Sequence, residues 1–127
     1  MSELEGRRGQ SLVEFALILG ILVWILFGVL DLGRVAQTYI VIKNAAREGA
    51  YYGSMHPGDS TAIKGRVVGE AEYSGVTIAP DDVTISHTGA SGDPIRVTVT
   101  HDVSLLMAWA VGSQSLHLSA FVEMAVI

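Results

Sequence analysis

Several residue types are absent or scarce in this 127-residue chain. There is no cysteine, which excludes disulfide bonds, zinc–thiolate sites and cysteine nucleophiles. Eight basic residues face thirteen acidic ones, giving a net charge of -5, and no basic patch is present to neutralise the phosphates of a nucleic acid. Charged residues make up only 17% of the chain and hydrophobic residues 50%. This balance is apolar for a soluble protein of this size, and one dense apolar segment explains much of it.

The sequence also lacks a catalytic or metal-binding motif. The histidines at positions 56, 87, 101 and 117 have no metal-ligand spacing. Asp81, Asp82 and Asp93 suggest at most a weak calcium site, because no twelve-residue calcium loop is present and capping or turn roles explain these acids. There is no phosphate-binding loop and no Gly-x-Ser-x-Gly motif. We therefore expect neither enzymatic activity nor a cofactor.

Residues 12–30 form the apolar segment, which contains a single charged residue, Glu14. At 1.5 Å per residue a helix of this length spans about 28 Å, close to the ~30 Å hydrocarbon thickness of a bilayer. Arg7 and Arg8 precede the segment, so the positive-inside rule predicts a cytoplasmic N-terminus with the remainder outside. A simple single-span anchor and a buried core helix of a soluble protein are the alternatives.

Glu14 is the sharpest functional clue, because a carboxylate at the edge of hydrocarbon is costly and normally has a role. In the simplest interpretation it lies among lipid headgroups and complements the N-terminus of the helix. Cleavage after Gly9 would make Gln10 the first residue, with a positively charged α-amine. In two staggered helices, Glu14 of one chain could then pair with the Gln10 amine of the next, and this pairing would set the register of a filament.

Residues 9–17, Gly-Gln-Ser-Leu-Val-Glu-Phe-Ala-Leu, resemble the processing and assembly motif of type IV pilin-like proteins. The resemblance is greatest to the TadE-like pilins and pseudopilins of the tight-adherence (Flp) pilus system. Residues 44–50, Asn-Ala-Ala-Arg-Glu-Gly-Ala, are similar to the segment that ends the long helix in this family. The resemblance implies that a prepilin peptidase cleaves between Gly9 and Gln10, and that Glu14, the fifth mature residue, acts in assembly.

The pattern of the first half predicts one helix over residues 10–54, because the first proline is at position 57 and apolar residues recur at helical spacing beyond the apolar segment. Gly20 and Gly28 are costly inside a helix. They favour close approach of neighbouring helices, with local melting as the alternative. A stripe of small residues at four-residue spacing is expected to let a sheet or second helix pack closely; its members are Ala45, Gly49 and Gly53.

The remaining residues predict a small α+β head on this long helix. Ser60 is expected to cap a second helix over residues 61–73. Alternating residues predict strands at 82–87, 95–100 and 116–127, which would form a three-stranded antiparallel sheet covered by the long helix. Residues 105–111 contain no polar side chain. They would either fold over the sheet as core or remain exposed to a neighbouring subunit or a membrane.

Together these patterns divide the chain into a leader peptide (1–9), a transmembrane or filament-core helix (10–32) and an extracytoplasmic head with the amphipathic half of the long helix (33–127). The resemblance implies a structural pilin or pseudopilin supporting adhesion and surface attachment. It would lie in the inner membrane as a precursor and in a surface filament once assembled. Its partners would be copies of itself, a prepilin peptidase, an assembly ATPase and a membrane platform protein. The alternative is a non-polymerising single-span protein whose exported head binds a partner and primes assembly.

Overall fold

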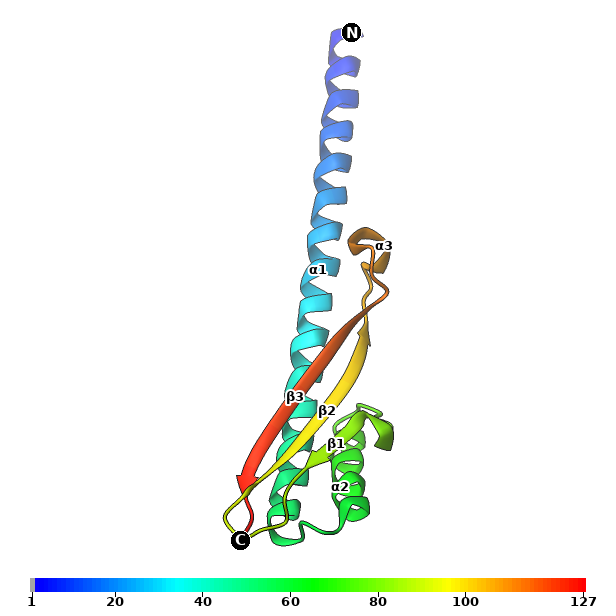
Figure 1. Cartoon of the computed structure of the whole chain (residues 1–127). Helices are drawn as coiled ribbons and strands as arrows, with labels where there is room; N and C mark the ends of the chain where they lie inside the picture. Colours follow the sequence, from blue (N-terminus) through cyan, green and yellow to red (C-terminus); the bar gives the residue numbers. More distant parts are fainter. Residues whose placement is uncertain (1) are drawn as a thin grey trace.

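The computed structural model describes residues 2–127, which form a long helix with a small α+β head along its C-terminal half (Figure 1). The elements, in chain order, are α1 (Ser2–Met55), α2 (Ser60–Tyr73), the 3-10 helix η1 (Pro80–Asp82), β1 (Val83–Ser86), β2 (Pro94–Ser104), α3 (Ala108–Val111) and β3 (Ser115–Ala125). The predicted fold class is confirmed: a long N-terminal helix packs on a three-stranded antiparallel sheet.

Helix α1 has 54 residues and is therefore about 80 Å long. Its N-terminal half extends beyond the head, and the sheet crosses its C-terminal half diagonally (Figure 1). Only this second half has a buried face, formed by residues at three- and four-residue spacing: Ile42, Ala45, Ala46 and Ala50. The helix already includes Glu3 to Gly9, so it begins earlier than the predicted start at Gln10.

Helix α2 packs on α1 through its buried residues Ile63, Val67 and Ala71. The prediction that Ser60 caps this helix is wrong by one residue. Asp59 is the cap, since its Oδ1 accepts a hydrogen bond of 3.0 Å from the Ala62 N–H. Aspartate and serine are about equally good caps, so the residue types alone could not decide which of the two adjacent positions begins the helix.

The sheet has the order β1-β2-β3, with both pairs antiparallel. Its buried face alternates along β2 through Ile95, Val97 and Val99, and this face packs against α1. Strand β2 continues to Ser104, four residues beyond the predicted end at position 100. The sequence pattern did not predict this extension because polar residues interrupt the alternation. In the structure Asp102 lies opposite His117 in β3, with 2.6 Å between the Asp102 Oδ1 and the His117 Nδ1. Cross-strand pairing therefore continues where the hydrophobic pattern weakens.

We call residues 105–111 the apolar tip; they follow β2 and include α3. The tip does not cover the sheet, so the interpretation of this segment as sheet core is wrong. Instead α3 lies beside the middle of α1, toward the end of the head that faces the N-terminus (Figure 1). Trp109 is 74% exposed and Val111 65% exposed. The alternative interpretation, contact with another molecule or a membrane, is the one consistent with this position.

Candidate functional site

The apolar segment of α1, residues 12–30, is exposed at every position except Gly28, which is half-buried. Its large hydrophobic side chains are between 41% and 69% exposed. The helix that contains it is long and apolar enough to cross a membrane, and its most apolar window is not buried by the rest of the protein. A core helix of a soluble protein would bury most of such a segment. The structure therefore supports membrane anchoring through α1.

Glu14 and Gln10 lie on one face of α1, a single turn apart. The Gln10 Nε2 donates a hydrogen bond of 3.2 Å to the Glu14 Oε1, and both residues are exposed. Gly9 precedes them within the same helix, with nothing within 4 Å of where a Cβ would be. The structure thus brings the predicted assembly residues together at one end of the apolar segment, next to the predicted cleavage position. Cleavage and intersubunit pairing stay predictions.

The glycines of the apolar segment differ in their surroundings. A Cβ added at Gly20 would meet nothing within 4 Å, and Gly20 lies in a shallow groove of about 450 Å³ on the surface of α1. At Gly28 an added Cβ would lie 3.6 Å from the Met107 Sδ of the apolar tip. Gly20 is therefore open to another helix, whereas Gly28 faces the chain's own head.

The small residues of the second half of α1 lie inside the head. Ala45 is fully buried. A Cβ at Gly49 would clash with Cγ2 of Val67 in α2, and one at Gly53 would lie 2.6 Å from Cδ1 of Ile95 in β2. These positions let α2 and the sheet approach α1 closely, because any larger side chain would push them apart.

Asp31 is a residue whose role sequence reasoning missed. It directly follows the apolar segment in the sequence, and it is just 8% exposed. Its Oδ1 accepts a hydrogen bond of 2.8 Å from the Leu106 N–H, and its Oδ2 one of 2.9 Å from the Met107 N–H. Bonds to a charged acceptor are stronger than neutral ones. The carboxylate therefore fixes the apolar tip to α1 at the boundary of the apolar segment.

A pair of tryptophans makes the second contact between the tip and α1. The rings of Trp24 and Trp109 meet edge to face, with centroids 4.6 Å apart and an interplanar angle of 71°. Beside them a groove of about 220 Å³ is lined by apolar side chains from both segments: Val23, Trp24, Phe27, Leu106, Met107 and Trp109. The head thus contacts α1 within the apolar segment and not only beyond it.

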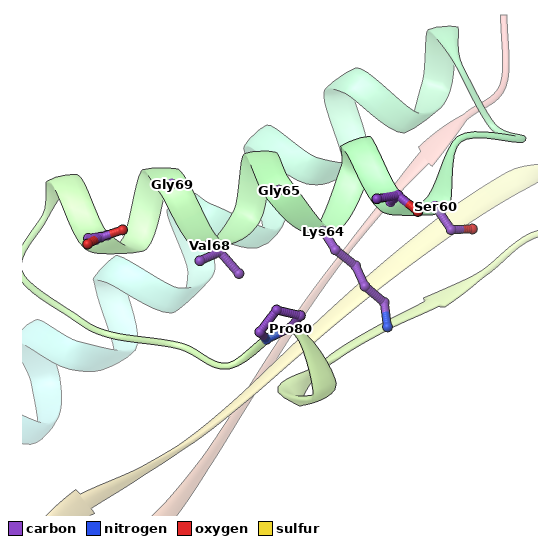
Figure 2. Close-up of a pocket in the computed structure, with 8 residues that line it drawn as sticks. Ser60, Lys64, Gly65, Val68, Gly69 and Pro80 are labelled. Carbon is purple, nitrogen blue, oxygen red and sulfur yellow. The ribbon is translucent and has the colours of Figure 1, made fainter.

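A larger groove, of about 570 Å³, lies between α2 and η1. Figure 2 shows Val68 and Pro80 on its two sides, with Lys64 toward the N-terminal end of α2. Gly65 and Gly69 leave it open, and Lys64 and Glu72 are the charged residues that line it. No group of three His, Asp or Glu residues among residues 2–127 is placed to hold a metal ion. The groove follows from the small side chains of α2, and its lining suggests no reaction.

Comparison with known proteins gives one match. The family model described as TadE-like protein matches residues 9–50, which include Gly9, Gln10, Glu14, Asp31 and Gly49. No curated protein and no solved structure matches the chain. The match points to involvement in the tight-adherence pilus system. Over residues 9–50, about a third of its length, this chain matches the TadE-like protein family, which confirms the predicted resemblance.

Proposed function

We propose that this chain is a structural subunit, a pilin or pseudopilin, of a tight-adherence pilus and that it polymerises through its N-terminal helix. The observation that carries the proposal is the exposed apolar segment, which extends from the head and has Glu14 as its one charged residue. Such a helix has two suitable environments, lipid before assembly and the apolar segments of other copies after it.

Assembly would begin with the precursor in the inner membrane, with Arg7 and Arg8 in the cytoplasm. A prepilin peptidase cuts between Gly9 and Gln10. The new α-amine of Gln10 is positively charged at neutral pH, and in the filament it pairs with Glu14 of an adjacent copy. Since a wrong stagger leaves either charge unpaired in an apolar surrounding, the pairing selects one register.

The proposed partners follow from this path. Copies of the chain form the filament, with apolar segments inside and heads on the surface at the cell exterior. The prepilin peptidase acts on the precursor, and an assembly ATPase with a membrane platform protein supplies the work of extraction. The assembled filament serves adhesion and surface attachment. No nucleic acid and no catalytic step enters this function.

Replacing Glu14 tests the proposal. We expect Glu14→Ala and Glu14→Leu to leave the protein in the membrane fraction but to abolish filaments in electron micrographs, because the Gln10 amine loses its acceptor. N-terminal sequencing of filaments of the unaltered protein should show that the chains in them begin at Gln10. The matched control is Glu72→Ala, which removes an exposed carboxylate from the head and should leave filaments unchanged. Normal filaments from both Glu14 variants would contradict the assembly role.

A non-polymerising subunit that primes assembly is the second candidate. Strand β3 is an edge of the sheet and is eleven residues long, so it offers unpaired backbone groups to another chain. In part this edge is already occupied, because the Lys43 Nζ donates a hydrogen bond of 3.3 Å to the Phe121 carbonyl oxygen. Electron microscopy of the unaltered protein separates the two candidates, since fibres favour a filament subunit and dispersed particles favour a priming subunit.

A further inference from the structure

The apolar tip is the largest feature that the proposed function leaves unexplained. Its seven residues, Leu-Leu-Met-Ala-Trp-Ala-Val, include no polar side chain. Leu106, Trp109 and Val111 remain largely exposed although the tip is fixed to α1. An exposed apolar cluster of this kind usually marks a contact with another surface.

The position of the tip along α1 indicates which surface it meets. Trp24, the partner of Trp109, lies six residues before the end of the apolar segment, which corresponds to about 9 Å along the helix axis. When the apolar segment crosses a bilayer, the tip is carried to the same depth. Segments that lie in the membrane interface bury their apolar side about 5–10 Å into the headgroup and acyl boundary. The distance of about 9 Å between Trp24 and the end of the apolar segment lies within this range.

The backbone of the tip is also suited to lipid, where each unbonded N–H group is costly. Leu106 and Met107 donate to the Asp31 carboxylate. Two further donors bond within the tip, where the N–H groups of Ala110 and Val111 reach the Met107 carbonyl, and the N–H of Gly112, directly after the tip, reaches the Ala108 carbonyl. The bonds from Leu106 and Met107 also give each carboxylate oxygen of the buried Asp31 a hydrogen-bond donor. The fold therefore presents apolar side chains on a backbone whose donors are largely paired.

We propose that the apolar tip inserts into the outer-leaflet interface of the bilayer beside α1, so that the head rests on the membrane at a second point before assembly. The partner is the lipid at the boundary between headgroups and acyl chains, and Trp109 with Trp24 forms the aromatic anchor at that depth. This inference rests on the proposed membrane insertion of α1. The new element is that residues of the head itself, those of the apolar tip, hold the head against the membrane surface.

The chain offers a clean test because Trp24 and Trp109 are its only two tryptophans. Trp24→Phe leaves Trp109 as the sole indole and keeps an aromatic ring at the contact, and Trp109→Phe does the reverse. Each full-length variant is reconstituted into phosphatidylcholine vesicles, with and without lipids brominated along their acyl chains. Emission maximum, quenching by the brominated lipids and quenching by aqueous iodide are then recorded for both variants.

We expect Trp109 to show blue-shifted emission, loss of intensity with lipids brominated near the headgroup end of the chain, and protection from iodide. Red-shifted emission with strong iodide quenching would place Trp109 in water and overturn the inference. Protection from iodide without quenching by brominated lipid would place it against a second copy and overturn it equally. Trp24 provides the separate check on insertion, because failure of Trp24 to respond to brominated lipid contradicts the membrane span itself.

Discussion

Two carboxylates on α1, those of Asp31 and Glu14, differ in their burial and in their hydrogen-bond partners. Asp31 is buried and accepts two backbone hydrogen bonds from the apolar tip. Glu14 is exposed at the far end of the apolar segment and accepts a side-chain hydrogen bond from Gln10. A carboxylate with two charge-assisted bonds within its own chain is suited to holding the fold together. One that projects from an apolar helix is suited to pairing between chains.

Asp31→Ala is expected to free the apolar tip. The variant leaves the N–H groups of Leu106 and Met107 without their acceptor, which should lower the free energy of unfolding by about 1–3 kcal/mol. Hydrogen exchange in detergent micelles should show the amides of Leu106 and Met107 exchanging faster, with the Val97 amide in the centre of the sheet little changed.

Asp81→Ala is the matched control, since Asp81 is exposed in η1 and remote from the tip in sequence. It should leave both amides and the unfolding midpoint unchanged. Unaltered exchange at Leu106 and Met107 in the Asp31 variant would show that the carboxylate does not hold the tip.

At the scale of elements, α1 is one continuous helix with two different halves. The first half has exposed apolar residues on all sides, and the second has a narrow buried face of small residues that α2 and the sheet cover. Helix packing at such close range depends on the absence of side-chain atoms at the contact. Gly49 and Gly53, which lie on this buried face, should therefore tolerate substitution least.

Gly49→Ala compares directly with Gly65→Ala. At Gly49 a Cβ would clash with Val67, so we expect a loss of about 1–3 kcal/mol in the free energy of unfolding despite the better helix propensity of alanine. At Gly65, inside α2, a Cβ would meet nothing within 4 Å, and alanine should add about 0.5–1 kcal/mol. Chemical unfolding of both variants measures the difference. Equal stability of the two would contradict the packing role of Gly49.

Much of this arrangement is predictable from the sequence, because helix and strand periodicity are local properties. The proline-free run gives α1, and alternating β-branched residues give β1 and the first half of β2. The hydrogen bonds of Asp31 are not predictable in this way, since its partners lie 75 and 76 residues away and are backbone groups without a side-chain signature. Periodicity likewise does not show that the apolar tip folds back along α1.

At the scale of the whole molecule, the charges and the apolar segment predict how the chain lies across a membrane. Arg7 and Arg8 precede the apolar segment, and the head follows it. The loop between β1 and β2 lies far from the N-terminus (Figure 1), and its residues 88–92 are exposed. The loop and the N-terminal residues should therefore lie on opposite sides of the bilayer.

Because the chain has no cysteine, single introduced thiols report this orientation without background. Ser91→Cys, in the exposed loop, should react with a membrane-impermeant maleimide added outside intact spheroplasts. Glu3→Cys, in precursor made without a prepilin peptidase, should react only after the membrane is permeabilised. Labelling in the reverse pattern would contradict the proposed topology, and labelling of both from outside would contradict the membrane span.

The hydrogen bonds between Asp31 and the apolar tip also fix the order of events during biosynthesis. The ribosome completes α1 long before it reaches Leu106, which is 75 residues later. Until then the Asp31 carboxylate lacks the two backbone donors of the finished protein. In the proposed topology the contact closes only after β1 and β2 have been exported, because the tip follows them in the chain. A stalled or truncated chain would thus carry an Asp31 carboxylate without its two backbone donors, which distinguishes it chemically from a finished chain.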